Sequence, residues 1–202
     1  MEEKNVTSRR DRNLADIRRK GGDAAEQLLV KKGYEALSAR GLAQAAGCSV
    51  GALYNAFGHI DGVVREVNMR SARLLQAALA AAVTSTDANL ETKLTAMAEA
   101  YFDFARAEPE RWRALFSYPV QTPDDGRLFT VQDELQTMLR SVAGVKNDNG
   151  ADAVRLTLLW ASVHGLATLT ARDTIRGLDA GAARKFLTVL VRSGLATEID
   201  DP

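Results

Sequence analysis

The chain has 202 residues, and 46% of them are hydrophobic. This composition excludes a wholly disordered chain, and the length allows one or two globular domains. The 26 Lys and Arg balance the 26 Asp and Glu, so the net charge is zero. The single Cys48 excludes an intrachain disulfide. No secretory leader and no apolar run of about 20 residues is found, so we expect a cytoplasmic protein with no membrane partner.

The N-terminal part of the chain begins with a polar segment and continues into a long helix. Residues 1–10 lack an apolar period and carry basic side chains, which indicates a mobile basic arm, either solvated or in contact with DNA. Over residues 11–32 apolar side chains recur at helical spacing, and Gly33 can close this helix in a left-handed conformation. Residues 1–73 carry 13 Lys and Arg against 9 Asp and Glu, a small excess that is compatible with phosphate binding.

Two short helices follow, joined by a turn that contains a glycine. Ser38 is placed to cap the first helix, which stops at Gly47. Ser49 is placed to cap the second helix, over residues 50–57. Two short helices joined in this way can lay the second helix in the major groove of DNA while the first braces it, so the pattern predicts a helix-turn-helix.

A long helix is predicted next, at about residues 60–83, and the polar segment 84–89 ends it. Further helices are expected near 90–107, 109–118, 126–143, 150–173 and 179–196, separated by proline, asparagine and glycine. We therefore predict an all-α protein of about nine helices. A three-helix DNA-binding domain over 11–65 precedes a larger helical bundle over 66–202, and helix 60–83 connects them.

The helix-turn-helix segment carries a denser pattern than two caps and a turn. It reads Gly33-Tyr34, then Ser38-x-Arg40-x-Leu42-Ala43, then Ala46-Gly47-x-Ser49-x-Gly51-x-Leu53-Tyr54-x-x-Phe57. Over about residues 11–65 this resembles the DNA-binding domain of the tetracycline-repressor (TetR) family. The resemblance implies a homodimeric repressor of operator DNA that responds to a small effector. Ala56 and Ile60 depart from the family pattern, so two of the family's contacts are expected to be absent.

The resemblance also assigns roles in DNA binding to individual side chains. Those expected to face base edges are Arg40, Val50, Gly51, Ala52 and Asn55, and those expected to meet the DNA backbone are Ser49, Tyr54 and His59. Asparagine can bond adenine, arginine can bond guanine, and a methyl group suits thymine. Other interpretations stay open: Ser49 can be only a cap, Tyr54 half-buried core and His59 an ordinary surface residue.

In the C-terminal half, Trp160-x-x-x-His164-Gly165 resembles the signature of one TetR C-terminal subtype. The resemblance implies that the last two helices form a four-helix dimer contact, with core packing inside one protomer as the alternative. The candidate dimer residues are Leu159, Val163, Leu166, Phe186, Leu190 and Val191. The bundle is also expected to hold the effector. The candidate pocket residues are Tyr101, Phe104, Trp112, Phe116, Tyr118, Phe129, Met138, Trp160 and His164, several of which must be ordinary core.

Catalysis fits the sequence poorly. His59 and His164 lie far apart in the chain, and no phosphate-binding loop or metal-ligand cluster occurs, so no enzyme activity, cofactor or metal is predicted. A second function from a different class remains open. In that alternative the protein is a helix-turn-helix regulator without a small ligand, and its C-terminal bundle serves dimerisation or binding of a protein partner.

Overall fold

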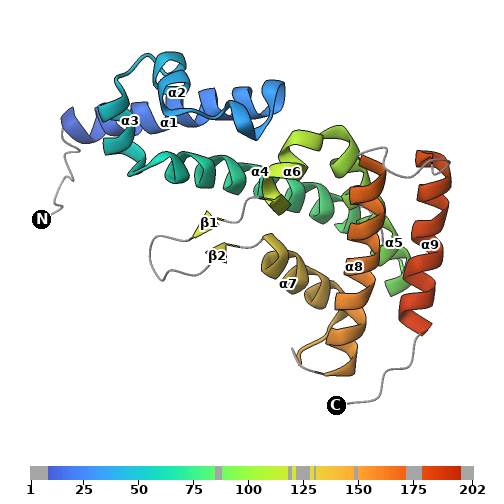
Figure 1. Cartoon of the computed structure of the whole chain (residues 1–202). Coiled ribbons are helices and arrows are strands. Elements are labelled where there is room, and N and C mark those ends of the chain that lie inside the picture. The colour runs from blue at the N-terminus through green and yellow to red at the C-terminus, as the bar shows by residue number, and fades with distance from the viewer. Residues whose placement is uncertain are drawn as a thin grey trace, which may run out of the picture. The chain divides into compact units, whose positions relative to one another are not determined.

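A computed structural model describes residues 9–84, 88–117, 120–121, 128–129, 131–147, 150–171 and 179–196, and these form an all-α protein, as predicted (Figure 1). The described part contains nine α-helices and one short 3-10 helix, Tyr34–Ala36. The α-helices are α1 (Arg9–Lys32), α2 (Ala39–Ala45), α3 (Val50–Phe57), α4 (Ile60–Thr84), α5 (Leu90–Ala107), α6 (Pro109–Ser117), α7 (Val131–Ala143), α8 (Ala151–Ala171) and α9 (Ala180–Ala196). None of them is both long and apolar enough to span a bilayer.

The chain divides into two compact units. Unit 1 comprises Met1–Ser71 and Arg113–Phe129, and unit 2 comprises Ala72–Trp112 and Thr130–Pro202. Residues 113–129, which we assigned to the second domain from sequence, therefore fall in unit 1. The reason is local packing: Ala114 is fully buried in the core of unit 1, and its carbonyl accepts a hydrogen bond of 3.3 Å from the Asn68 amide.

Unit 1 is built on α1, which packs against both α2 and α3. Gly33 follows α1 with φ 79° and ψ 175°, a positive-φ conformation that favours glycine but differs in ψ from the left-handed helical cap expected from sequence, and its amide donates to the Leu29 carbonyl. Ser38 caps α2 by accepting from the Gly41 amide at 3.2 Å, and Ser49 caps α3 by accepting from the Ala52 amide at 3.1 Å. The fully buried side chains of this unit include Ala25, Leu29, Leu42, Leu53 and Val63.

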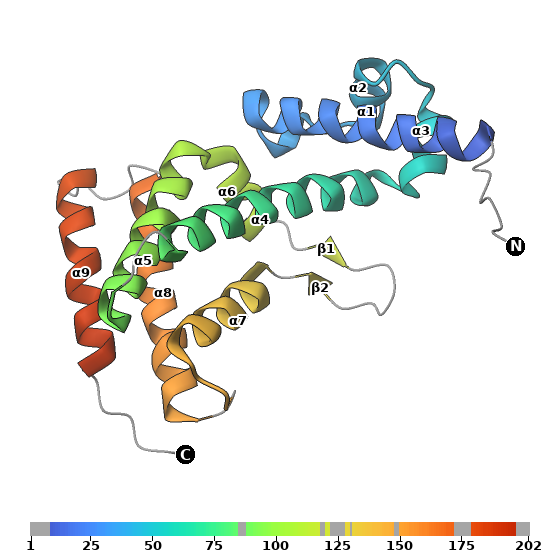
Figure 2. The ribbon, with the colours of Figure 1, turned by 180° about the vertical axis from the view of Figure 1, so that it is seen from behind.

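Unit 2 is a bundle in which α5, α8 and α9 pack against one another and α7 packs obliquely against α8 (Figure 2). Its most deeply buried large side chains are Leu75, Leu79, Leu94, Phe102, Leu135 and Leu187. The Asn89 side chain caps α5, since its Oδ1 accepts from the Thr92 amide at 3.0 Å. Asp179 caps α9 in the same way, through the Ala182 amide at 2.7 Å.

Two helix starts differ from those predicted. Helix α1 begins at Arg9 rather than at residue 11, so only residues 1–8 of the expected basic arm precede it, and these lie outside the described residues. Helix α7 begins at Val131 rather than near 126, because residues 128–129 form a strand, β2 (Leu128–Phe129). This strand pairs antiparallel with β1 (Val120–Gln121).

Candidate DNA-binding helix and apolar cavity

Helix α3 presents one face to the core of unit 1 and another to solvent. Leu53 and Ala56 face inward, with 0% and 2% of their surface exposed. Val50, Gly51, Tyr54 and Asn55 are exposed, and their spacing of one, four and five residues places them on a single face of the helix. A short exposed helix of this kind, braced by α2, has the geometry that reads a DNA groove.

The other residues assigned to DNA binding lie around α3. Arg40 is exposed in the first turn of α2, and Ala52 is half-buried. Exposed His59 follows α3, with its ring centroid 6.0 Å from that of Tyr54. The Ser49 hydroxyl accepts a hydrogen bond from the Ala52 amide, which confirms its predicted role as the cap of α3. A contact between Ser49 and a DNA phosphate stays a prediction.

The two positions that depart from the TetR pattern both pack inward. Ala56 is 2% exposed, and Ile60 is partly buried against the core of unit 1. The Ala56 carbonyl accepts a hydrogen bond of 2.7 Å from Arg18 Nε, so α1 satisfies one of the open carbonyls at the C-terminal end of α3. Sequence reasoning missed this role of Arg18.

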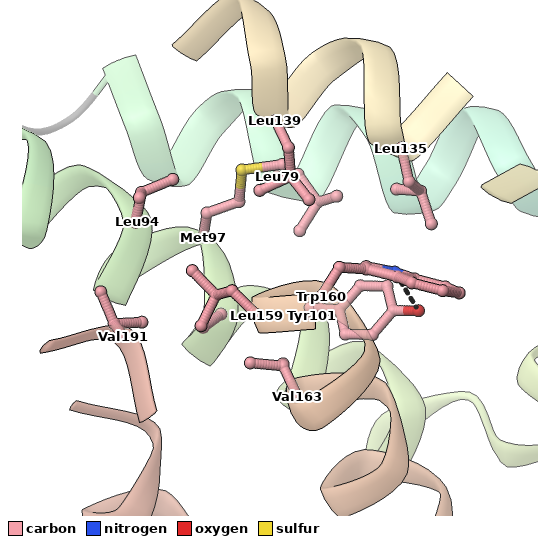
Figure 3. A pocket seen from close by; sticks show the side chains of 11 residues that line it. Leu79, Leu94, Met97, Tyr101, Leu135, Leu139, Leu159, Trp160, Val163 and Val191 are labelled. Atoms are coloured by element: carbon pink, nitrogen blue, oxygen red, sulfur yellow. Dashed lines mark hydrogen bonds between the residues drawn. The ribbon is translucent and has the colours of Figure 1, made fainter. Parts of the chain in front are cut away.

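Unit 2 contains an apolar cavity of about 30 Å3 between α4, α5, α7, α8 and α9 (Figure 3). Its wall is almost entirely aliphatic, with Tyr101 and Trp160 at one end. The lining residues are Leu79, Leu94, Met97, Ala98, Tyr101, Leu135, Leu139, Leu159, Trp160, Val163 and Val191. A volume of about 30 Å3 is far below the roughly 300–1,000 Å3 of sites for drug-sized ligands, so such a ligand could enter only if these side chains moved apart.

A chain of hydrogen bonds runs along the aromatic end of the cavity. Trp160 Nε1 donates to the Tyr101 hydroxyl at 3.2 Å, and that hydroxyl lies 2.9 Å from His164 Nδ1. Burial raises the pKa of Tyr101, so its hydroxyl keeps its proton. His164 Nε2 lies 3.4 Å from Thr168 Oγ1, so both ring nitrogens have a hydroxyl partner, and the tautomer of the imidazole determines which nitrogen donates.

The imidazole of His164 also stacks on two indoles. Its ring centroid lies 5.3 Å from that of Trp112 and 5.1 Å from that of Trp160, with interplanar angles of 24° and 25°. Trp112 in turn meets Tyr101 edge to face, with ring centroids 4.7 Å apart. His164 is therefore a half-buried histidine whose ring nitrogens and ring faces both have partners within unit 2.

This environment predicts a pH-dependent stability. Burial lowers the pKa of His164 below its ordinary value of 6.5, because the cation is poorly solvated there. Below about pH 6.5 the unfolded chain then binds a proton that the folded protein excludes, so the free energy of unfolding should fall as pH decreases. One such group accounts for at most about 1.4 kcal/mol per pH unit. Urea titrations between pH 7.5 and 5.5 measure this slope.

The two histidines provide a matched comparison for the pH effect. His164→Gln should flatten the slope, whereas His59→Gln, at an exposed position, should keep the wild-type slope. An identical slope in the wild type and in His164→Gln would show that His164 does not cause the pH dependence.

The structure separates the residues that were predicted to form one pocket. Tyr101 and Trp160 line the cavity, while Trp112 and His164 lie just behind Tyr101. Phe104 is buried elsewhere in the core, and Phe116 belongs to unit 1, so neither lines it. Met138 instead lines an open groove between α4 and α7. Tyr118 and the Phe129 side chain lie outside the described part of the chain.

Half of the residues predicted for the dimer contact face inward, which corrects that prediction. Leu159, Val163 and Val191 are between 0% and 6% exposed and line the cavity of their own protomer. Leu166 and Leu190 are half-buried. Phe186 is 53% exposed and remains available to a partner. Sequence reasoning missed other exposed apolar side chains of α8 and α9, namely Val154, Leu158, Leu169 and Val189.

Within the described ranges no group of three or more His, Cys, Asp or Glu side chains is arranged to hold a metal ion. The exposed face of α3, its brace α2 and the separate helical bundle together define a helix-turn-helix DNA-binding regulator with a second, all-helical unit.

Comparisons with known proteins identify the family. Residues 23–67 match the model of bacterial regulatory proteins of the tetR family, and residues 94–193 match that of a tetracyclin repressor-like C-terminal domain. The chain belongs to the TetR family of transcriptional regulators. The C-terminal subtype suggested by Trp-x-x-x-His-Gly is not confirmed by this match. No curated protein matches the chain significantly.

Solved structures share this fold. A protein with unknown function from Rhodococcus sp. RHA1 has 23% identity over 96% of this chain and 98% of its own, with a TM-score of 0.68. A TetR-family transcriptional regulator from Streptomyces coelicolor has 21% identity over 93% and 99%, with a TM-score of 0.66. The multidrug binding protein EbrR, complexed with imidazole, has 22% identity over 89% and 92%, with a TM-score of 0.63. At these identities the likeness concerns the fold alone.

Proposed function

We propose that this protein is a homodimeric repressor that binds a palindromic operator in the cytoplasm and is released by a small hydrophobic or amphipathic molecule. The observation that carries the DNA-binding part is the exposed face of α3, formed by Val50, Gly51, Tyr54 and Asn55. Gly51 lets the helix backbone approach the base edges closely, and the Asn55 amide can pair with adenine. Arg40 and His59 flank this face.

The effector would act through the apolar cavity of unit 2. Leu79 of α4 lines that cavity, and α4 begins at Ile60, shortly after α3 ends at Phe57. A molecule that enters the cavity must displace Leu79 and its neighbours. Because Leu79 belongs to α4, this displacement would shift the helix that directly follows the recognition helix α3. An allosteric coupling of about 1–3 kcal/mol would change operator affinity roughly 5- to 150-fold.

One observation favours the second candidate function, a regulator without a small ligand. The cavity holds only about 30 Å3, so the bundle is almost filled, and exposed apolar side chains on α8 and α9 offer a surface to protein partners. The two functions differ in their response to small apolar molecules, since only a sensor changes its operator affinity when such a molecule is added.

Selection of genomic fragments on the purified protein tests the proposal. The enriched duplex is then titrated by fluorescence anisotropy at 50 and 200 mM salt. We expect a short palindrome and an affinity that falls steeply with salt, by roughly 10^3 to 10^5 for 6–10 phosphate contacts. No enrichment over random DNA would contradict the proposal. Genes beside the enriched sites then indicate effectors for the same titration.

We propose that the partner protomer covers the exposed apolar side chains of α8 and α9. Leu158 is 55% exposed on α8, and Phe186 and Val189 are 53% and 54% exposed on α9, which packs beside α8. Gly165 lies on α8 with open space above it, so a partner helix could approach closely. Two-fold symmetry would bring each of these side chains into the contact twice.

Introducing a charge on this face should separate the protomers. Leu158→Asp would place an unpaired carboxylate in the contact from both sides, and we expect monomers in light scattering at micromolar concentration. Leu74→Asp is the matched control, because Leu74 is 47% exposed on α4, away from the proposed face. A Leu158→Asp protein that stays dimeric would remove α8 from the interface.

A further inference from the structure

Two adjacent glycines, Gly21 and Gly22, lie in the middle of α1 and are both buried. Glycine is the poorest helix former after proline, so a pair of them in a helix interior requires a reason. A Cβ at Gly21 would lie 2.8 Å from Phe57 Cε2, at the end of α3. A Cβ at Gly22 would overlap the guanidinium of Arg70, in α4. The pair thus lets two other helices approach α1 within one turn.

Further contacts join these helices on the same stretch of α1. Arg18 Nε donates to the Ala56 carbonyl of α3 at 2.7 Å, three residues before Gly21. Arg70 Nη1 donates to Asp23 Oδ1 at 2.8 Å and to Glu26 Oε2 at 3.1 Å, one and four residues after Gly22. Residues 18–26, which we call the positioning segment, therefore hold α3 at one end and α4 at the other.

Arg70 is fixed in place by more than these two bonds. Its Nε donates to Glu66 Oε1 at 2.9 Å on its own helix, and only 23% of its side chain is exposed. Three carboxylates thus orient one planar guanidinium, and Gly22 supplies the space it occupies. Helix α4 also approaches Phe57 closely, since a Cβ at Gly62 would overlap the Phe57 carbonyl.

We propose that the positioning segment sets the orientation of the recognition helix α3 relative to α4, and that Arg70 is the positioning residue on α4. This inference rests on the proposed DNA-binding function. In a dimer, the orientation of each α3 determines which half-site separation both can reach at once. Loosening Arg70 should therefore relax the preference for one operator spacing, an effect that a general loss of stability does not produce.

The test measures the full-length protein on its selected operator and on two duplexes with the half-sites one base pair closer or farther apart. The wild type should prefer its own spacing. Arg70→Met should reduce the ratio between the native and the shifted affinities by roughly 2- to 30-fold. Arg73→Met is the matched control, because Arg73 is an exposed arginine one turn further along α4, and it should keep the wild-type ratio. An unchanged ratio in Arg70→Met overturns the proposal, even if its melting temperature falls.

A double-mutant comparison tests the Gly22–Arg70 pair without DNA. In the Arg70→Met background no guanidinium meets the new methyl group, so Gly22→Ala should raise the melting temperature by roughly 2–4 °C through helix propensity alone. In the wild-type background Gly22→Ala displaces the Arg70 guanidinium, so the rise in melting temperature should be lost. Equal gains in both backgrounds contradict the coupling of Gly22 with Arg70. If the wild type selects no operator, the proposed function fails, and this comparison still decides whether the two residues act together.

Discussion

Replacing Asn55 with alanine is expected to lower operator affinity by roughly 5- to 150-fold while the dimer and its fold stay intact. Asn55 is exposed on α3 beside Tyr54, so its side chain is free to reach a base edge. A well-placed bidentate contact to a base contributes about 1–3 kcal/mol of discrimination, which corresponds to that range. Anisotropy titrations of the selected operator, with light scattering on the same samples, measure both quantities.

Two further measurements distinguish the loss of a base contact in Asn55→Ala from a general loss of charge or of folded structure. A base contact should lower affinity for the operator more than affinity for random DNA, and the salt slope should hardly change. Gln132→Ala removes an exposed amide from α7 in unit 2 and is the matched control, expected to bind as the wild type does. Full operator affinity in Asn55→Ala would remove Asn55 from the reading face.

Trp112→Ala is expected to produce the largest loss of stability, about 3–5 kcal/mol in the free energy of unfolding. Trp112 is 4% exposed, packs edge to face on Tyr101 and stacks on His164, so its loss leaves a void beside the hydrogen-bonded chain. Each kcal/mol corresponds to about 2–4 °C in the melting temperature of a protein of this size. Urea denaturation and thermal melts check the value.

Tyr54→Ala is the control for this prediction, because it also removes an aromatic ring but from an exposed position on α3, 37% accessible. Its effect on the free energy of unfolding should stay within about 0.5 kcal/mol. Trp112→Phe should lie between the two, since a smaller ring can still stack on His164. A loss below about 1 kcal/mol in Trp112→Ala would mean that the surrounding side chains close the void.

Local chemistry explains which parts of the fold are predictable from sequence. The bounds of α2 and α3 follow from Ser38, Ser49 and the glycine turn, because caps act within one helical turn. The start of α7 is not predictable in this way. A strand pair of two residues each has no alternating pattern to detect, so residues 126–130 read as the first turn of that helix.

The candidate site was predictable on α3 and poorly predictable in the bundle. Helix α8 is apolar on several sides: it buries Leu159 and exposes Leu158, so periodicity alone cannot tell the core face from the face offered to a partner. The cavity wall consists mainly of aliphatic side chains such as Leu79, Met97 and Leu135, contributed by five helices. Nothing in one sequence distinguishes them from ordinary core. The Gly21–Gly22 pair inside α1 was the one overlooked signal that the sequence does contain.

The hydrogen-bonded chain from Trp160 through Tyr101 to His164 has a consequence for selectivity. Both polar groups that face the cavity already bind each other, and no buried side-chain nitrogen or oxygen in the described part of the chain lacks a partner. A molecule that entered the cavity would find no free hydrogen-bonding group, so its affinity would depend only on its shape and on dispersion contacts with the wall. Affinity within a series of alkyl compounds should then rise about fourfold with each added methylene. It should fall abruptly at the chain length where Leu79 and Leu135 can separate no further.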